Sequence, residues 1–189
     1  MAQKPNIKPY HHMSSFNLQP RLENEFIRIV PLQADDFETL YAVASDPLIW
    51  EQHPNKDRYR REMFETFFKG AMESKGACLV YDRKTGTAIG SSRYYGADEA
   101  TRTIAIGYTF MARDHWGGIY NPALKGLMLE HAFGHFDTVI FHIGAHNIRS
   151  QKAMEKLGGK KIAELEMEYY GEPNKLNFVY EIRKEDRKK

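Results

Sequence analysis

Residues 103–136 place a short loop between a strand and a helix, an arrangement that can bind a phosphate group. The strand reads TIAIGYTF, the polar loop that follows reads ARDHWGGIY, and Asn121-Pro122 opens a helix with an apolar stripe. The first turn of a helix leaves up to four backbone N–H groups unpaired and carries the positive end of the helix dipole. A phosphate or pyrophosphate can therefore bind there without a dedicated cationic side chain.

Three residues near this junction bear on its chemistry. Gly117 and Gly118 would let another backbone approach closely, although paired glycines are also common in ordinary turns. Lys125 lies one helical turn after Asn121, where its cation could reinforce the anion site or simply be solvated. The glycine pair does not form GxGxxG, and no GxxxxGK[ST] occurs in the chain, so the Rossmann and P-loop nucleotide sites are both disfavoured.

The elements that position this junction can be read from hydrophobic periodicity. It predicts a strand, two helices, three antiparallel strands, a helix, a strand, a helix and a closing hairpin with the turn GEPNK, residues 171–175. The strand after the helix at Asn121 should lie parallel to the strand before it, through a right-handed crossover. The predicted strands are 25–32, 78–82, 88–95, 102–110, 138–143, 161–170 and 176–182, and the predicted helices are 34–44, 60–71, 121–136 and 147–157.

These elements predict a mixed α/β (α+β) fold, with a mostly antiparallel central sheet of about seven strands flanked by about four helices. The length of 189 residues suits one domain. We place that domain at residues 21–184, between an N-terminal extension, residues 1–20, and a charged tail, residues 185–189.

Composition narrows the classes of function. The formal charge of +2, with acids interleaved among bases, gives no support for nucleic-acid binding. No apolar run approaches the roughly 20 residues of a membrane span, and the N-terminus lacks the apolar core of a signal peptide, which predicts a cytoplasmic protein without a membrane partner. Cys78 is the single cysteine and lies in an apolar run, so we expect a buried thiol and not a nucleophile.

Two segments resemble the acetyl-coenzyme A signatures of the GCN5-related N-acetyltransferase (GNAT) superfamily. They are WGGIYNPALKGLMLEHAF, residues 116–133, and HNIRSQKAMEKLGG, residues 146–159, and the similarity extends from Leu22 to Ile182. The branch that the chain resembles is that of the ribosomal-protein N-terminal acetyltransferases. The resemblance implies a GNAT-like fold and direct transfer of the acetyl group of acetyl-coenzyme A to a primary amine, either a protein N-terminus or a small molecule, with no metal.

The resemblance also implies where acetyl-coenzyme A would bind. The pyrophosphate would sit on residues 116–121, and the pantetheine arm would run beside the end of the preceding strand, in a gap toward residues 138–143. The residues so implied are Phe110, Met111, Ala112, Trp116, Gly117, Gly118, Ile119, Tyr120, Asn121, Lys125, Asn147 and Ser150.

The first signature departs from the family pattern. Trp116, Ile119 and Asn121 stand where the pattern has Gln or Arg, then Gly, then Gly or Ala, whereas Asn121 and Lys125 match the ribosomal-protein branch. Backbone amides and not side chains would anchor the phosphates. The departure therefore weakens the match to the sequence pattern more than it weakens the expected phosphate binding.

The residues that serve as catalytic acid and base in many relatives are replaced by other residue types in this chain. Met154 stands where many relatives have a tyrosine acid, which leaves Ser150 as the group to hydrogen-bond the thiolate, unless it only helps to cap the helix that begins at Asn147. Ala105 stands where many relatives have a glutamate base.

The general base is therefore expected in the aromatic loop of residues 50–59, which borders the acceptor site in family members. Glu51 and His53 are the candidates, since an unperturbed histidine titrates near neutrality, although both would ordinarily be solvated loop residues. Tyr94 and His142 are weaker candidates, each explained equally well as a residue of the sheet.

Two other classes of function stay open. Glu130, His131 and His135 put two histidines one turn apart, a spacing that can bind zinc, but the order is not that of the zincins and no third ligand is evident. The displaced acid and base also permit a non-catalytic acyl-coenzyme A binding or interaction module on the same fold. The amine acceptor is not identified by the sequence, and a homodimer through the C-terminal strands is suggested by the resemblance alone.

Overall fold

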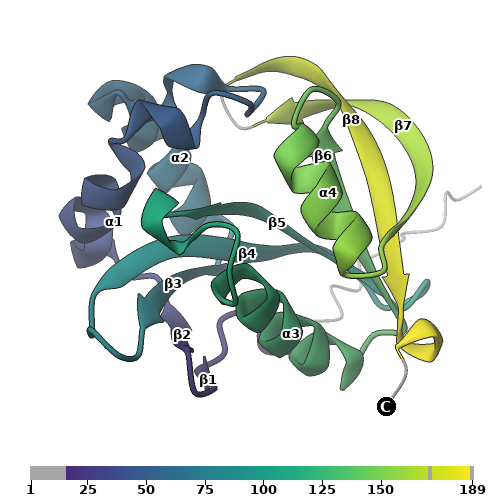
Figure 1. Ribbon diagram of the computed structural model, residues 1–189. Coiled ribbons are helices and arrows are strands. Elements are labelled where there is room, and N and C mark those ends of the chain that lie inside the picture. Colours follow the sequence, from purple (N-terminus) through teal and green to yellow (C-terminus); the bar gives the residue numbers. More distant parts are fainter. Residues whose placement is uncertain (1–15, 170–171, 188–189) are drawn as a thin grey trace, which may run out of the picture.

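The computed structural model describes residues 16–169 and 172–187, and its centre is one eight-stranded sheet (Figure 1). The strand order is β1-β2-β3-β4-β5-β6-β8-β7, and neighbours are antiparallel except for the parallel pair β5 and β6. The strands are β1 (Leu22–Glu23), β2 (Ile27–Pro31), β3 (Ala77–Asp82), β4 (Ala88–Asp98), β5 (Thr103–Met111), β6 (Thr138–Gly144), β7 (Lys160–Tyr169) and β8 (Glu172–Arg183).

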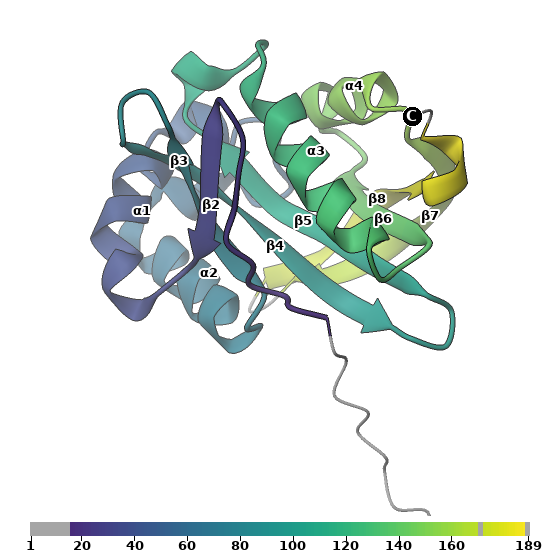
Figure 2. The same ribbon diagram turned by 90° about the horizontal axis from the view of Figure 1, so that it is seen from below.

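Four α-helices cover the two faces of the sheet (Figures 1 and 2). They are α1 (Phe37–Ala44), α2 (Arg61–Glu73), α3 (Tyr120–Phe133) and α4 (Ile148–Lys156). The alternation of side chains along β3 separates two cores: Cys78 and Val80 pack in one core with residues of α3 and α4, and Leu79 packs in the other with residues of α1 and α2. The thiol of Cys78 is buried, as the sequence predicts, and burial raises its pKa to about 12.

The predicted fold class is confirmed, including the parallel crossover between β5 and β6. The eighth strand is the two-residue β1, which pairs with β2. The predicted turn at residues 171–175 is wrong in its length, because the β7–β8 ladder continues through the pairs Met167–Lys175 and Tyr169–Glu172. Residues 170 and 171 lie outside the described residues.

Residues 16–20 of the predicted extension pack against the domain. The ring of Phe16 is buried, with its centroid 5.4 Å from that of Tyr94, 4.6 Å from His131 and 5.0 Å from Phe136. The packed part of the chain therefore includes Phe16, while residues 1–15 lie outside the described residues.

The feature of the fold that matters for the site is a gap inside the sheet. β5 and β6 pair only through residues 103–105 and 138–140. Beyond this point β5 carries a bulge, because Ser91 pairs with Phe110 but Arg93 pairs with Gly107, and Tyr108 in the bulge has a positive φ of 52°. Since a bulge bends the strand that carries it, the second half of β5 separates from β6.

Candidate functional site

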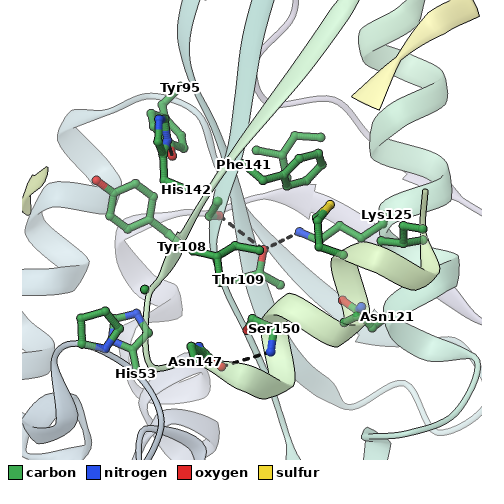
Figure 3. A pocket seen from close by; sticks show the side chains of 18 residues that line it. His53, Tyr95, Tyr108, Thr109, Asn121, Lys125, Phe141, His142, Asn147 and Ser150 are labelled. Carbon is green, nitrogen blue, oxygen red and sulfur yellow. Dashed lines mark hydrogen bonds between the residues drawn. The ribbon is translucent and has the colours of Figure 1, made fainter. Parts of the chain in front are cut away.

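A cavity of about 140 Å³ opens where β5 and β6 separate (Figure 3). Residues 106–109 of β5 and 141–144 of β6 line it, and side chains of α3, α4 and the loop before α2 close it. We call it the strand cavity.

A second opening, of about 160 Å³, lies beside the loop that precedes α3, and we call it the loop hollow. It is lined by residues 110–111 at the end of β5, by residues 115–117 of the loop and by Arg149 of α4. Asn121, Ser150 and Ala153 line both openings. The two openings therefore adjoin at these three residues, and together they extend from the loop to the gap in the sheet; we call the pair the path.

The loop before α3 is held in place by hydrogen bonds to the sheet. Tyr120 donates its hydroxyl proton to Asp82 Oδ2 at 3.1 Å, and His115 Nε2 lies 3.4 Å from the same oxygen. Trp116 Nε1 donates to the carbonyl of Met111 at 2.8 Å. These hydrogen bonds hold the loop in one position beside the loop hollow.

The amino end of α3 is open to an anion. The helix begins at Tyr120, and the side chain of its N-cap residue, Ile119, makes no capping hydrogen bond. Gly117 has a φ of 72°, in the left-handed region that favours glycine, and a Cβ added to Gly117 or Gly118 would meet nothing within 4 Å. The N–H groups of the first turn thus lack a side-chain cap beside an uncrowded loop, which suits a phosphate.

Arg149, which sequence reasoning did not single out, covers the loop from α4. Its Cζ lies 3.8 Å from the ring centroid of Trp116, and its Nη2 donates to the carbonyl of Ile49 at 3.1 Å. Burial lowers the pKa of Arg149, an effect that the nearby Glu51 opposes. Its place in the run NIRS, between the cap residue Asn147 and Ser150, was the only available signal.

The two predicted bases take different positions. Glu51 is exposed, lies 3.8 Å from Arg149 Nη1, and lines neither opening. His53 lines the strand cavity, but Asn55 N–H donates to its Nδ1 at 3.0 Å and Arg58 Nη1 lies 3.2 Å from its Nε2. Burial, and then the Arg58 cation, hold the pKa of His53 well below its usual range. The ring is therefore neutral and a weak proton acceptor.

Asn147 and Ser150 have separate roles at the start of α4. Asn147 Oδ1 accepts the Ser150 N–H at 3.1 Å, so the cap is the asparagine side chain. The Ser150 side chain lines the strand cavity, as Figure 3 shows, and it also lines the loop hollow. The hydroxyl therefore remains a candidate for contact with a ligand.

Lys125 lies deep in the strand cavity. Its side chain is buried, with 6% of the residue exposed, and its Nζ donates to Thr109 Oγ1 of β5 at 2.6 Å (Figure 3). Burial lowers the pKa of Lys125 to about 7. Thr109 was also missed by sequence reasoning, although it is a polar residue within an apolar strand run.

Tyr95 and His142 form a pair on the other side of the cavity. The Tyr95 hydroxyl oxygen lies 2.7 Å from His142 Nδ1, and burial lowers the pKa of His142. Tyr94, by contrast, is buried and donates its hydroxyl proton to the carbonyl of Met128 at 2.6 Å, which is a structural role. Ala105 is buried in the paired part of β5.

The structure brings together most of the residues expected to bind acetyl-coenzyme A. Those that line at least one opening are Phe110, Met111, Trp116, Gly117, Asn121, Lys125, Asn147 and Ser150. Those that line neither are Ala112, Gly118 and Ile119, which lie in the loop beside the openings, and Tyr120, the first residue of α3.

The histidines considered for metal binding make other contacts. His131 Nε2 lies 2.9 Å from the carbonyl oxygen of Asn17, and His135 Nε2 lies 2.8 Å from Glu99 Oε1. Within residues 16–169 and 172–187, no group of three or more His, Cys, Asp or Glu residues could hold a metal ion. Among the same residues, no helix is long and apolar enough to cross a membrane.

Solved structures share this fold at low sequence identity. A probable GNAT acetyltransferase from Chromobacterium violaceum superposes with a TM-score of 0.77 at 17% identity, over 97% of this chain and 96% of that one. A spermidine N-acetyltransferase from Vibrio cholerae, in complex with coenzyme A and spermine, gives 0.64 at 14% identity, over 86% and 98%. The ribosomal-protein-S5-alanine acetyltransferase from Vibrio fischeri gives 0.64 at 16% identity, over 90% and 100%.

The family is decided by the sequence match. No curated protein matches the chain. The family model described as "Acetyltransferase (GNAT) domain" matches residues 27–160, which include β2 through the end of α4 and so contain both openings and the loop between them. The chain belongs to this GNAT acetyltransferase family and is an acyltransferase.

Proposed function

We propose that the protein transfers the acetyl group of acetyl-coenzyme A to a primary amine by direct attack. The observation that carries this proposal is the pair of adjoining openings that extends from the uncapped amino end of α3 to the gap between β5 and β6. A pyrophosphate on the loop and an extended arm along β5 fit the two ends of this path, because unpaired N–H groups favour an anion and an unpaired strand edge favours an extended partner.

Different residues along the path would contact different parts of acetyl-coenzyme A. The backbone of residues 116–121 would hold the pyrophosphate, with Arg149 fixed over Trp116 as a nearby cation. The arm would lie beside Phe110 and Met111, which are on the separated half of β5. The Ser150 hydroxyl would face the arm where the loop hollow meets the strand cavity.

The reaction needs a neutral amine, because an ammonium group has no lone pair with which to attack the thioester carbonyl. Of the candidate bases, His142 has the most suitable surroundings: Nδ1 lies against Tyr95, and Nε2 has no hydrogen-bond partner among the described residues. A lowered pKa keeps the ring neutral at pH 7 and able to accept a proton. Glu51 and His53 stay as alternatives, through a water molecule.

The identity of the acceptor is the finer question. A spermidine N-acetyltransferase and a ribosomal-protein acetyltransferase superpose on this chain with the same TM-score of 0.64, so the fold does not separate small polyamines from protein N-termini. Release of free thiol from acetyl-coenzyme A should be measured across N-terminal peptides, polyamines and aminoglycosides. Turnover with one class is expected. Binding of coenzyme A without turnover on any amine would favour the non-catalytic binder.

Substitutions at the start of α4 test the two roles separately. Ser150→Ala removes only the hydroxyl in the path, so we expect kcat to fall about tenfold while the Tm stays within about 1 °C. Asn147→Ala removes the helix cap and is expected to cost about 1 kcal/mol of stability. Thiol release and thermal unfolding of both variants measure these effects. If Ser150→Ala lowers the Tm as much as Asn147→Ala and leaves kcat unchanged, the serine is structural.

A further inference from the structure

Lys125 is a buried cation on the wall of the strand cavity, and it forms no ion pair with any of the described residues. No carboxylate is among the described residues that line the cavity. The titratable groups that face Lys125 across it are His53 from the loop before α2, Tyr95 from β4, Tyr108 from β5 and His142 from β6. The α4 wall contributes only uncharged side chains, among them Ser150 and Met154.

The amine is held by hydroxyl groups and by a ring. Lys125 Nζ donates to Thr109 Oγ1 at 2.6 Å, and Thr109 Oγ1 lies 2.8 Å from Ser92 Oγ. Nζ also lies 5.7 Å from the centroid of the Phe141 ring on β6. These contacts fix the position of the amine between β5 and β6, at the gap itself.

A lysine in this position is unfavourable for the fold. A buried ammonium group without a counter-ion loses its hydration, and this loss brings its pKa to about 7. Leucine or methionine would fill the same helix position without that loss. A costly group retained in a cavity is more readily explained by chemistry than by packing.

Under the proposed function, the thioester would also react in the strand cavity. If the pyrophosphate lies on the loop and the arm follows β5, the thioester at the end of the arm lies in the strand cavity, beyond the residues shared by the two openings. Met154 also lines the cavity and has no proton to give. Lys125 is the only amine among the described residues that line it.

We propose that Lys125 donates the proton that the coenzyme A sulfur takes up when the thioester breaks, with Thr109 positioning the amine; this inference rests on the proposed function. The acceptor nitrogen bonds to the carbonyl carbon, and collapse of the tetrahedral intermediate breaks the C–S bond, whose electron pair stays on sulfur. The Lys125 ammonium gives a proton to that sulfur and regains one from solvent. The acceptor ammonium loses two protons in all, so one proton is released per turnover.

The substitution Lys125→Met tests the proposal, with Lys69→Met on the exposed face of α2 as a matched control. A proton donor must be charged, so wild-type kcat should fall as the pH rises above the pKa of Lys125. We expect Lys125→Met to lower kcat at least about 100-fold and to lose this alkaline fall, while the Kd of coenzyme A changes less than about threefold. Thr109→Val should lower kcat less than Lys125→Met does, and it should shift the pH at which kcat falls. Lys69→Met should match the wild type.

A second measurement does not depend on turnover. The thiol of bound coenzyme A is titrated by the ultraviolet absorbance of its thiolate. A forming thiolate raises the pKa of an adjacent Lys125 above its value of about 7 in the free protein, so the two groups titrate as a coupled pair, and we expect thiolate to appear at lower pH in the wild type than in the Lys125→Met complex. If the wild type binds coenzyme A but acetylates no amine, the proposed function fails while this titration still tests the contact. Equal thiol pKa values in the two proteins, or a weakened Kd with unchanged kcat, would overturn the assignment of Lys125 as proton donor.

Discussion

Replacing Lys125 with methionine is expected to raise the free energy of unfolding by about 2 to 4 kcal/mol at pH 7. In the folded chain this lysine has a pKa of about 7, whereas its ordinary value is 10.5. Between these two values the unfolded chain holds a proton that the folded chain has lost, so low pH favours unfolding. The full penalty, at most about 5 kcal/mol, applies below pH 7, and the lost hydrogen bond to Thr109 offsets part of the gain.

The pH dependence of the stability gain in Lys125→Met shows whether the gain comes from the titration of Lys125 or from better packing of methionine. Because the penalty fades as the pH approaches 10.5, the advantage of the methionine variant should shrink steadily between about pH 7 and pH 10. Denaturant unfolding of the wild type, Lys125→Met and the control Lys69→Met across this range measures the difference. A stability gain that is the same at every pH would mean that the methionine merely packs better and that Lys125 does not titrate between these values.

Replacing Gly90 with alanine is expected to cost about 3 kcal/mol or more, the upper end of the usual range for overpacking. A Cβ on Gly90 would lie 2.1 Å from the carbonyl oxygen of Phe110 and 3.0 Å from the Cα of Met111. Both atoms belong to the backbone of β5, which pairs with β4 at this point and cannot move without breaking the ladder. Since Phe110 and Met111 line the loop hollow, coenzyme A binding should weaken as well.

Gly126 provides the control for this substitution. It lies in the middle of α3, and a Cβ there would meet nothing within 4 Å, so Gly126→Ala should stabilise the protein by about 0.5 to 1 kcal/mol through its higher helix propensity. Unfolding in urea and titration with coenzyme A should be compared for the two variants. Equal stability of Gly90→Ala and the wild type would mean that β4 and β5 do not approach this closely.

The sequence predicted the parts of the site that depend on local patterns. The strand ending near Phe110, the loop of residues 112–120 and the helix opening beside Asn121 are each encoded by neighbouring residues, and the structure has them within one residue. The cap at Asn147 follows from the same kind of signal.

What the sequence could not predict depends on tertiary packing. A lysine in a largely apolar helix can face solvent or a cavity, and only the position of α3 over the gap buries Lys125. His53 looked like a solvated loop residue, yet Arg58 and Asn55 enclose its ring. The distant partners Tyr95 and His142 are 47 residues apart in the chain, so no local pattern joins them.

Because β5 and β6 pair over only a short length, a ligand bound between them would also stabilise the sheet. Among the described residues, the ladder between the half of the sheet made of β1–β5 and the half made of β6, β8 and β7 has three residue pairs. An extended arm lying in the gap would act as a short ninth strand and couple two halves that otherwise meet over a small part of their length. Saturation with coenzyme A should therefore slow amide hydrogen exchange in β6 and β8 as well as beside the loop, making the cooperativity of the sheet depend on its substrate.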